Sequence, residues 1–425
     1  MNDRSDQFVR IEKPVYGGDF LARAEGKAIF VPLALPGEAA RVRVVGEKSG
    51  YANAEIERIE EAASCRVMPR CAHFGTCGGC QYQHTDEATQ IEFKRAILRE
   101  ALERGGVRVE DEIGVLAGAP WGYRNRIRLT FDAQGRLGYR GRRSHNVVPI
   151  TECPIAAPVL MEAAAIFAEC AQAWKQKPTE VTLFCNADET ALLMSAVFAR
   201  APKLDVNTLG HEMAARVPAL KGIDLLVAAR GNAMPHAVAR WGETSLTYDA
   251  AGFAYRVDHG AFFQVNRFLI DRFVQQVTAG YAGRLAWDLF AGVGLFARQL
   301  TAGFERVVAV ESAGASTQAL AANLKFTRST PVRAATLDFL RRNHGDARPD
   351  FVVVDPPRNG LGAEVVSQLV EVAPADVVYV SCDPATLARD LSVLLKNGYR
   401  LHAVTLVDLF PQTFHLETVV QLKRA

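Results

Sequence analysis

Leu285-Ala-Trp-Asp288-Leu-Phe-Ala-Gly292-Val-Gly294-Leu295 is the stretch that decides the fold of this chain. It is an apolar run that ends in an acid and leads directly into a turn with two glycines. Glycines at a strand-to-helix turn let the backbone approach a ligand closely. Three further apolar runs follow, at 307–310, 351–354 and 377–380, with helical patterns between them. Near-continuous apolar strands that alternate with helices predict a parallel sheet covered on both faces.

Each of these four runs leads into a residue that can take part in chemistry. Asp288 lies in the first, and Glu311, Asp355 and Cys382 follow the others. Ligands of open α/β sheets bind outside the carboxyl ends of the strands, so we expect these side chains to converge on one crevice. Core packing alone does not explain why such residues stand at successive strand ends.

The glycine turn favours a nucleoside cofactor other than a dinucleotide. A dinucleotide-binding turn has a third glycine that helps to hold pyrophosphate at a helix N-terminus. Ala297 stands at that position in this chain. Glu311 follows Gly294 by seventeen residues, where a ribose-binding carboxylate is expected. The pattern is similar to that of class I methyltransferases, which use S-adenosylmethionine, although a Gly-x-Gly alone is often only a tight turn.

The N-terminal segment predicts a small β-barrel. Short runs of strand-forming residues lie at 9–13, 26–31, 39–45 and 51–56, with turn residues between them. Arg41 and Arg43 alternate with apolar residues in the third run. One barrel face therefore either meets phosphate or is a solvated strand edge.

An amphipathic helix and a basic strand pair are expected after the barrel. Residues 86–104 have helical periodicity and are followed by two glycines. Between Tyr123 and Arg143 the chain has seven arginines and one aspartate, interleaved with aromatic residues. Basic strands with aromatic side chains are suited to looped or single-stranded RNA. A solvated charged surface is the alternative.

The overall composition is that of an ordinary soluble globular protein, with 425 residues, 49% hydrophobic residues and a net charge of +2. No apolar stretch approaches the length of a membrane span, and the first residues lack the apolar core of a signal peptide. We therefore expect a cytoplasmic protein without a membrane partner. Eight cysteines in a reducing compartment argue against a disulfide framework, and the four between Cys65 and Cys80 suggest a metal site.

Together the motifs resemble the bacterial RNA uracil-C5 methyltransferases, especially the ribosomal RNA enzymes with a TRAM domain and an iron–sulfur cluster. The resemblance covers nearly the whole chain. Its motifs are Gly-Gly-Asp-Phe20, Phe30-Val-Pro, Pro36-Gly-Glu38, Cys71-x5-Cys77-Gly-Gly-Cys80, Phe262-Phe-Gln264-Val-Asn266, Asp288-Leu-Phe-Ala-Gly-Val-Gly294, Asp355-Pro-Pro-Arg358, Ser381-Cys382-Asp-Pro384 and His415-Leu-Glu417.

The resemblance implies an enzyme that methylates carbon 5 of a uridine, with Cys382 as nucleophile and Glu417 as the base that removes the carbon-5 proton. The expected substrate is 23S ribosomal RNA, with transfer RNA as the alternative, and the expected state is a monomer. The S-adenosylmethionine pocket would include Gln264, Asp288, Phe290, Gly292, Gly294, Leu295 through its backbone, Glu311, Asp338 and Asp355. Two departures from the family pattern stand out: Asp383, whose charge is expected to raise the pKa of the thiol, and Leu295, a position that is often polar.

The resemblance also implies a [4Fe–4S] cluster held by Cys71, Cys77, Cys80 and Cys153. Structural zinc is the competing interpretation. Tetrahedral zinc held by four cysteines usually comes with two close pairs. Here three cysteines are clustered and one is remote, which favours iron–sulfur.

Two other functions compete with uracil methylation. An amino methyltransferase could use Asp355-Pro-Pro as its catalytic loop, but such enzymes need an aromatic residue next, and Arg358 is there. A non-catalytic iron–sulfur RNA-binding protein would have lost Cys382 or Glu417, and both are present.

The expected fold is a multidomain α/β protein with three parts. Residues 1–64 form a TRAM, OB-like barrel, and residues 65–260 form a central α+β domain with the iron–sulfur cysteines. Residues 261–425 form a Rossmann-like, doubly wound methyltransferase domain. The helix at 86–104 is expected to pack on this last domain.

Overall fold

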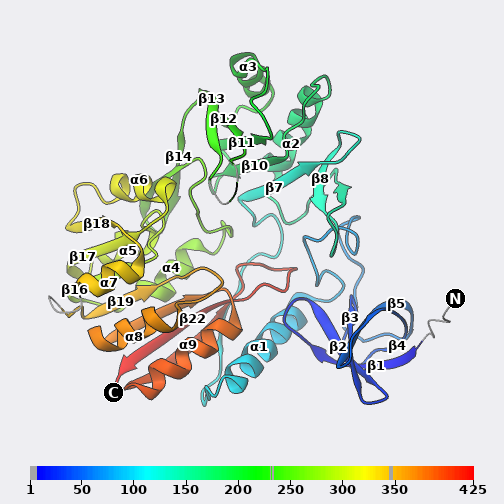
Figure 1. Cartoon of the computed structure of the whole chain (residues 1–425), viewed down its shortest axis with the longest axis horizontal. Helices are drawn as coiled ribbons and strands as arrows, with labels where there is room; N and C mark the ends of the chain where they lie inside the picture. Colours follow the sequence, from blue (N-terminus) through cyan, green and yellow to red (C-terminus); the bar gives the residue numbers. More distant parts are fainter. Residues whose placement is uncertain (1–6, 230, 232–233, 344–347) are drawn as a thin grey trace.

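The computed structural model describes residues 7–229, 231, 234–343 and 348–425. Its secondary structure forms an N-terminal barrel, a central mixed sheet and a C-terminal α/β sheet, which occupy three separate regions in Figure 1. The predicted multidomain α/β fold with a small N-terminal β-barrel is therefore confirmed.

The barrel is closed by five strands in the order β1-β2-β3-β5-β4. Their bounds are β1 (Gln7–Pro14), β2 (Asp19–Ala24), β3 (Lys27–Pro32), β4 (Ala39–Glu47) and β5 (Tyr51–Glu61). Apolar side chains such as Val9, Phe20 and Val31 alternate inward and are buried. Four of the strands match the predicted runs, whereas β2 was not predicted. It follows the turn at Gly17 and Gly18, both with positive φ.

The arginines of the third barrel run do not form an open phosphate-binding face. Arg41 pairs with Glu60 at 3.0 Å, and Arg43 pairs with Glu57 at 3.1 Å. Both glutamates lie on β5, the antiparallel neighbour of β4. The structure thus favours a solvated surface with paired charges, although β4 is not an edge strand, because it pairs with both β1 and β5.

The predicted amphipathic helix is α1 (Glu87–Arg104), whose N-cap Asp86 accepts a hydrogen bond from the N–H of Thr89 at 2.8 Å. Its apolar side joins the core of the C-terminal sheet, beside α9 (Pro384–Lys396) in Figure 1. Gly105 ends the helix where a Cβ atom would lie 2.6 Å from that of Ala388, so a larger residue would push the two helices apart.

The central sheet has seven strands in the order β13-β12-β11-β10-β7-β8-β9. Its elements are β7 (Arg126–Phe131), β8 (Leu137–Arg140), β9 (Val147–Pro149), α2 (Pro158–Ala171), β10 (Glu180–Cys185), β11 (Leu192–Phe198), α3 (Val206–Arg216), β12 (Leu220–Val227) and β13 (His236–Gly242). Helices α2 and α3 pack on one face. The hairpin of β14 (Ser245–Ala250) and β15 (Phe253–Asp258) leads into the C-terminal domain.

The C-terminal sheet has eight strands in the order β18-β17-β16-β19-β20-β22-β21-β6. The strands are β6 (Gly114–Leu116), β16 (Gly283–Leu289), β17 (Phe304–Glu311), β18 (Ser329–Arg333), β19 (Phe351–Val354), β20 (Asp376–Ser381), β21 (Tyr399–Val407) and β22 (Glu417–Arg424). The helices are α4 (Ile270–Thr278), α5 (Leu295–Leu300), α6 (Gly314–Asn323), α7 (Thr336–Asn343), α8 (Gly362–Val372) and α9. Strands β16 to β20 pair in parallel, as predicted, and β22 enters antiparallel between β20 and β21.

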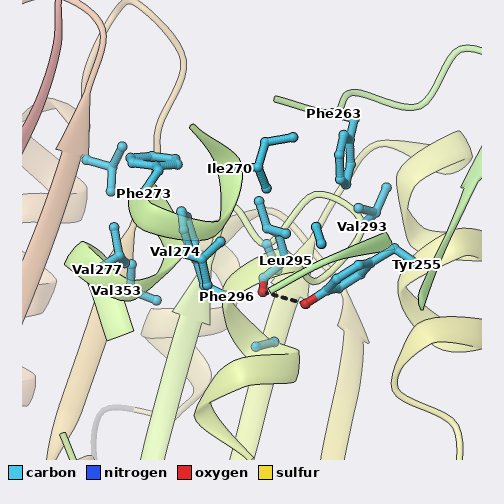
Figure 2. Packing of buried hydrophobic residues seen from close by; sticks show 14 of the residues in the cluster. Tyr255, Phe263, Ile270, Phe273, Val274, Val277, Val293, Leu295, Phe296 and Val353 are labelled. Carbon is cyan, nitrogen blue, oxygen red and sulfur yellow. Dashed lines mark hydrogen bonds between the residues drawn. The ribbon is translucent and has the colours of Figure 1, made fainter. Parts of the chain in front are cut away.

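Two apolar layers cover this sheet, one on each face. Helices α4, α5 and α6 contribute to the first layer, and α1, α7, α8 and α9 contribute to the second. Figure 2 shows side chains of the first layer, including Phe263 and Phe273, around the start of α5. The hydroxyl of Tyr255 donates to the carbonyl oxygen of Leu295 at 3.2 Å, which ties the β14–β15 hairpin to the glycine turn. No helix in the described residues is long and apolar enough to cross a membrane.

Candidate active site

The glycine turn after β16 is shaped by residues with positive φ. Gly292 and Gly294 have φ values of 56° and 90°, and Phe290 has a φ of 67°. A Cβ atom on Gly294 would lie 2.7 Å from a methyl carbon of Leu320, so glycine is required both for the backbone conformation and for the close approach.

Two carboxylates hold this turn in place. Glu311, at the end of β17, accepts the N–H of Gly292 at 2.9 Å and those of Ser312 and Ala313 at 2.6 Å. Asp288 is fully buried and accepts the N–H of Ala297 at 2.8 Å, while its other oxygen has no protein partner among the described residues. Burial, followed by the charges of Asp355 and Glu311, raises the pKa of Asp288 to about 8.

A narrow cavity lies over the turn, and most of the predicted cofactor residues surround it. Its lining includes Gln264, Phe290, Gly292, Leu295 and Asp355. Asp288 and Gly294 stabilise the conformation of the turn but do not line the cavity. Asp338 is exposed in the first turn of α7, away from the cavity lining.

Cys382 and Glu417 are brought together by strand register. Ser381, the last residue of β20, pairs with Thr418 of β22. Cys382 and Glu417 are the next residues outward on this antiparallel pair. Cys382 is half-buried and Glu417 is 5% exposed, so both lie at the carboxyl edge of the sheet near Asp355, shielded from bulk water.

Buried acidic groups gather at this edge, and burial favours their neutral forms. Burial and the charge of Asp355 raise the pKa of Glu417, and burial raises that of Asp355 to about 7. Burial, Glu417 and Asp355 together raise the pKa of the Cys382 thiol to about 12, against the opposing effect of Arg358. Asp383 has a different main role, because it caps α9 by accepting the N–H groups of Ala385 and Thr386.

Sequence reasoning missed three residues that lie around Cys382. Tyr16, in the barrel turn between β1 and β2, donates to the carbonyl oxygen of Cys382 at 3.3 Å. Arg358 lies 3.2 Å from Nδ1 of His415, which links the loops after β19 and before β22. Arg358 and His415 stand inside quoted motifs and could have been singled out. Tyr16 gives no sequence signal, because its contact spans 366 residues.

The four predicted cluster cysteines line one cavity of about 270 Å³, together with Arg124, Tyr139 and His415. Burial raises the pKa of the Cys80 thiol to about 12, and it also raises the pKa values of Cys71, Cys77 and Cys153. Within the described residues, no group of three or more His, Cys, Asp or Glu side chains is arranged to hold a single metal ion. The donor set thus consists of four thiols that share a cavity without converging on one point.

Comparison with known proteins shows relatives along the whole chain. A protein of Klebsiella pneumoniae named 23S rRNA (uracil(1939)-C(5))-methyltransferase is 33% identical, over 96% of this chain and 93% of its own. A protein of Chromohalobacter salexigens with the same name is also 33% identical, over 100% of this chain and 90% of its own. An uncharacterized RNA methyltransferase of Thermotoga maritima is 30% identical over 97% of this chain and 98% of its own.

This chain belongs to the RNA uracil-C5 methyltransferase family. A sequence model of the tRNA (uracil-5-)-methyltransferase family also matches residues 343–425, which include Cys382 and Glu417. In fold, the chain resembles the tRNA (uracil-54, C5)-methyltransferase of Pyrococcus abyssi, solved with S-adenosyl-L-homocysteine. The TM-score is 0.79, with 24% identity over 98% of this chain and 100% of that one. The resemblance to RNA uracil-C5 methyltransferases inferred from the motifs is confirmed.

The charges around Cys382 make a prediction for its reactivity. Arg358 is the positive charge that lowers the pKa of the Cys382 thiol, so Arg358→Gln should raise this pKa and decrease the thiolate fraction. At pH 8.5 we expect alkylation of Cys382 by iodoacetamide to become about three- to tenfold slower in this variant, because a tenfold fall in the thiolate fraction corresponds to a rise of about one in the pKa.

Peptide mass spectrometry would give the rates, with Cys170 of α2 in the same protein as the control thiol. A Cys382 rate in Arg358→Gln that is equal to or higher than that of the wild type would contradict this account of the electrostatics.

Proposed function

We propose that this family member methylates carbon 5 of one uridine in RNA through a covalent bond between Cys382 and carbon 6 of the base, with Glu417 as the base. The observation that carries the proposal is the placement of Cys382 beside Glu417 by the β20–β22 register, next to the cavity over the glycine turn.

The chemistry requires both side chains. Carbon 5 of uracil is too weak a nucleophile to take a methyl group unaided. When the Cys382 sulfur bonds to carbon 6, the electron pair of the carbon 5–carbon 6 double bond moves toward carbon 5 and oxygen 4, which makes carbon 5 nucleophilic. S-adenosylmethionine, when bound, supplies the methyl group. Glu417 then takes the proton from carbon 5, the double bond reforms, and the carbon 6–sulfur bond breaks to return the thiolate.

The burial of Glu417 suits this role. A carboxylate with a raised pKa is a stronger proton acceptor once it is ionised. Burial of Cys382 has the opposite effect on the nucleophile, because it disfavours the thiolate. The positive charge of Arg358 opposes this effect of burial on the thiol. The hydrogen bond between Arg358 and His415 holds the guanidinium beside the loop that leads to Glu417.

For the cofactor, we propose that Gln264, Phe290, Leu295, Glu311 and Asp355 contact S-adenosylmethionine. Their places around the glycine turn support this. Asp288, Gly292 and Gly294 would shape the pocket. Asp338, exposed on α7, would act only at its rim.

For the substrate, we propose 23S ribosomal RNA. Two relatives that align with nearly the whole chain carry that substrate in their names, whereas the Pyrococcus protein named for transfer RNA is less similar in sequence. A cavity of about 490 Å³ where the barrel, the cysteine loop and the basic strands meet supports RNA binding. It is lined by Arg128, Arg140, Arg142, Arg143 and Phe414, the last of which is three residues from Glu417.

For the cysteines, we propose a [4Fe–4S] cluster held by Cys71, Cys77, Cys80 and Cys153. The support is that all four thiols line one cavity, and that a cysteine triplet with one remote cysteine differs from the two close pairs usual for structural zinc. The cluster would be structural, because it would tie the cysteine loop to β8 and the Cys153 loop.

We further propose that the first domain ends at residue 64 and the central domain at residue 260, except that two elements of the central segment belong to the C-terminal domain. α1 and β6 lie in the central segment of the sequence but complete the C-terminal core and sheet.

RNA that contains 5-fluorouridine at the target position tests the nucleophile. Fluorine cannot leave as a proton, so the wild-type protein with S-adenosylmethionine should accumulate a protein–RNA adduct that survives denaturing electrophoresis. Cys382→Ala should form none, while Cys170→Ala should match the wild type. An equal yield from Cys382→Ala would refute the assignment.

Anaerobic purification tests the cluster. We expect about four iron atoms per chain and a broad absorbance at roughly 400 nm from thiolate-to-iron charge transfer. Both should be lost in Cys153→Ser. Stoichiometric zinc without this absorbance would contradict the proposal.

A further inference from the structure

Among the described residues, the basic strands contain one arginine, Arg126 of β7, that has no carboxylate partner and no hydrogen bond from its guanidinium. Arg126 and Arg128 lie on the same face of β7, because side chains alternate along a strand. Ile127 and Leu129 point the other way, into the core under α2. The arginine face of β7 is therefore turned away from α2.

Most arginines of this segment have a carboxylate partner. Arg128 lies 3.3 Å from Glu180, and Arg136 lies 2.7 Å from Asp132. The two other ion pairs join Arg142 to Glu55 and Arg143 to Asp19. Arg140 contacts His145, and Arg124 lines the cysteine cavity. In the described part of the chain, Arg126 makes no ion pair and its guanidinium donates no hydrogen bond.

Arg126 is also held in place more firmly than a surface arginine. Its Nε atom is buried without a hydrogen-bond partner, and its guanidinium lies 4.3 Å from the ring centroid of Phe184 on β10. Burial and the neighbouring charge of Arg128 lower the pKa of Arg126 to about 10, so it is still a cation at neutral pH. A half-buried, uncompensated cation is costly and favours an anion supplied from outside the chain.

The aromatic contacts of Arg126 lead to the catalytic domain. Phe184 stacks on Tyr248 with a centroid distance of 6.1 Å and an interplanar angle of 11°. Tyr248 lies 4.4 Å from Phe263 by centroids, and Phe263 precedes Gln264 at the cofactor cavity. Arg126 is thus positioned by the same packed aromatic groups that position the wall of the active site.

We propose that Arg126 binds a backbone phosphate of the RNA next to the methylated uridine and so positions that uridine for Cys382. The inference rests on the proposed function, in which RNA is the anionic substrate. An arginine matches phosphate with two parallel hydrogen bonds, and a pre-positioned guanidinium loses little side-chain entropy on binding. Phosphate contacts fix register without reading sequence, and they offset the cost of flipping a base out of folded RNA.

The test measures binding of a transcribed 23S rRNA fragment, which contains the position equivalent to uracil 1939 of the relatives, at several salt concentrations. Loss of one phosphate contact should reduce the slope of log affinity against log salt by about 0.7 to 0.9. We expect this change in Arg126→Gln, with affinity at least about tenfold weaker at low salt. Arg126→Lys should regain the slope and part of the affinity. Arg216→Gln removes a paired arginine of the same domain, on α3, and should change neither quantity.

A second experiment identifies the phosphate that Arg126 binds. RNA with a neutral methylphosphonate at one phosphate that flanks the target uridine should bind the wild type as weakly as normal RNA binds Arg126→Gln. The methylphosphonate RNA should bind Arg126→Gln no more weakly than it binds the wild type. If the losses of binding free energy from the RNA change and the protein change add fully at each of the two flanking phosphates, the assigned position of the phosphate is wrong.

Other outcomes separate the remaining explanations. Weaker binding of Arg126→Gln with an unchanged salt slope would assign Arg126 a purely structural role and overturn the inference. A lower affinity for S-adenosylhomocysteine with normal RNA binding would assign it to the cofactor carboxylate, with the same consequence. If the wild type neither binds nor methylates the fragment, the proposed substrate fails and this inference fails with it.

Discussion

The buried ion pair between Lys94 and Asp408 is the interaction on which the active site depends. The Nζ atom of Lys94 is fully buried on α1 and donates to Asp408 at 2.6 Å and to the carbonyl oxygen of Phe410 at 2.9 Å. Removing one partner of such a pair leaves an unpaired buried charge, which typically costs about 3–5 kcal/mol. Asp408 begins the loop that leads to Glu417, so this pair fixes one end of the segment that carries Glu417.

The rest of that loop is held by other parts of the chain. Gln90 of α1 and Gln412 exchange hydrogen bonds of 2.9 and 3.0 Å. Further groups that bind the loop backbone are the N–H groups of Gln81 and Tyr82, the hydroxyl of Tyr123 and the side chain of Asn266. The barrel adds Tyr16, which contacts both Phe414 and the carbonyl oxygen of Cys382. The position of Glu417 is therefore a property of the whole chain and not of the methyltransferase sheet alone.

The small net charge conceals a segregation of acidic and basic side chains. The carboxyl edge of the sheet gathers Asp288, Asp355 and Glu417, whose pKa values are all raised by burial. A cation placed at this edge, such as the sulfonium of S-adenosylmethionine, would favour the ionised form of these carboxyl groups. Arg128 of β7 and Arg140 of β8 instead line the separate cavity beside the barrel.

Much of the fold and of this site could be predicted because strand ends and glycine turns are local signals. The apolar runs placed Asp288, Glu311, Asp355 and Cys382 at one edge, and the sheet order β17-β16-β19-β20 makes those ends adjacent. The insertion of β22 beside β20 is a long-range pairing with no local signature, so the residues alone did not place Glu417 next to Cys382. The family resemblance supplied that role. The Lys94–Asp408 pair and the neutralised barrel arginines were missed for the same reason, since their partners are set by tertiary packing.

The central claim is that Cys382 and Glu417 act in sequence on one base, and trapping by Glu417→Gln tests it most directly. With unmodified RNA and S-adenosylmethionine labelled in its methyl group, this variant should attack and methylate the uridine but fail to remove the carbon-5 proton. A denaturation-resistant adduct should accumulate that contains the label and is linked through Cys382. Normal turnover by Glu417→Gln without an adduct, or an adduct attached at another residue, would contradict the claim.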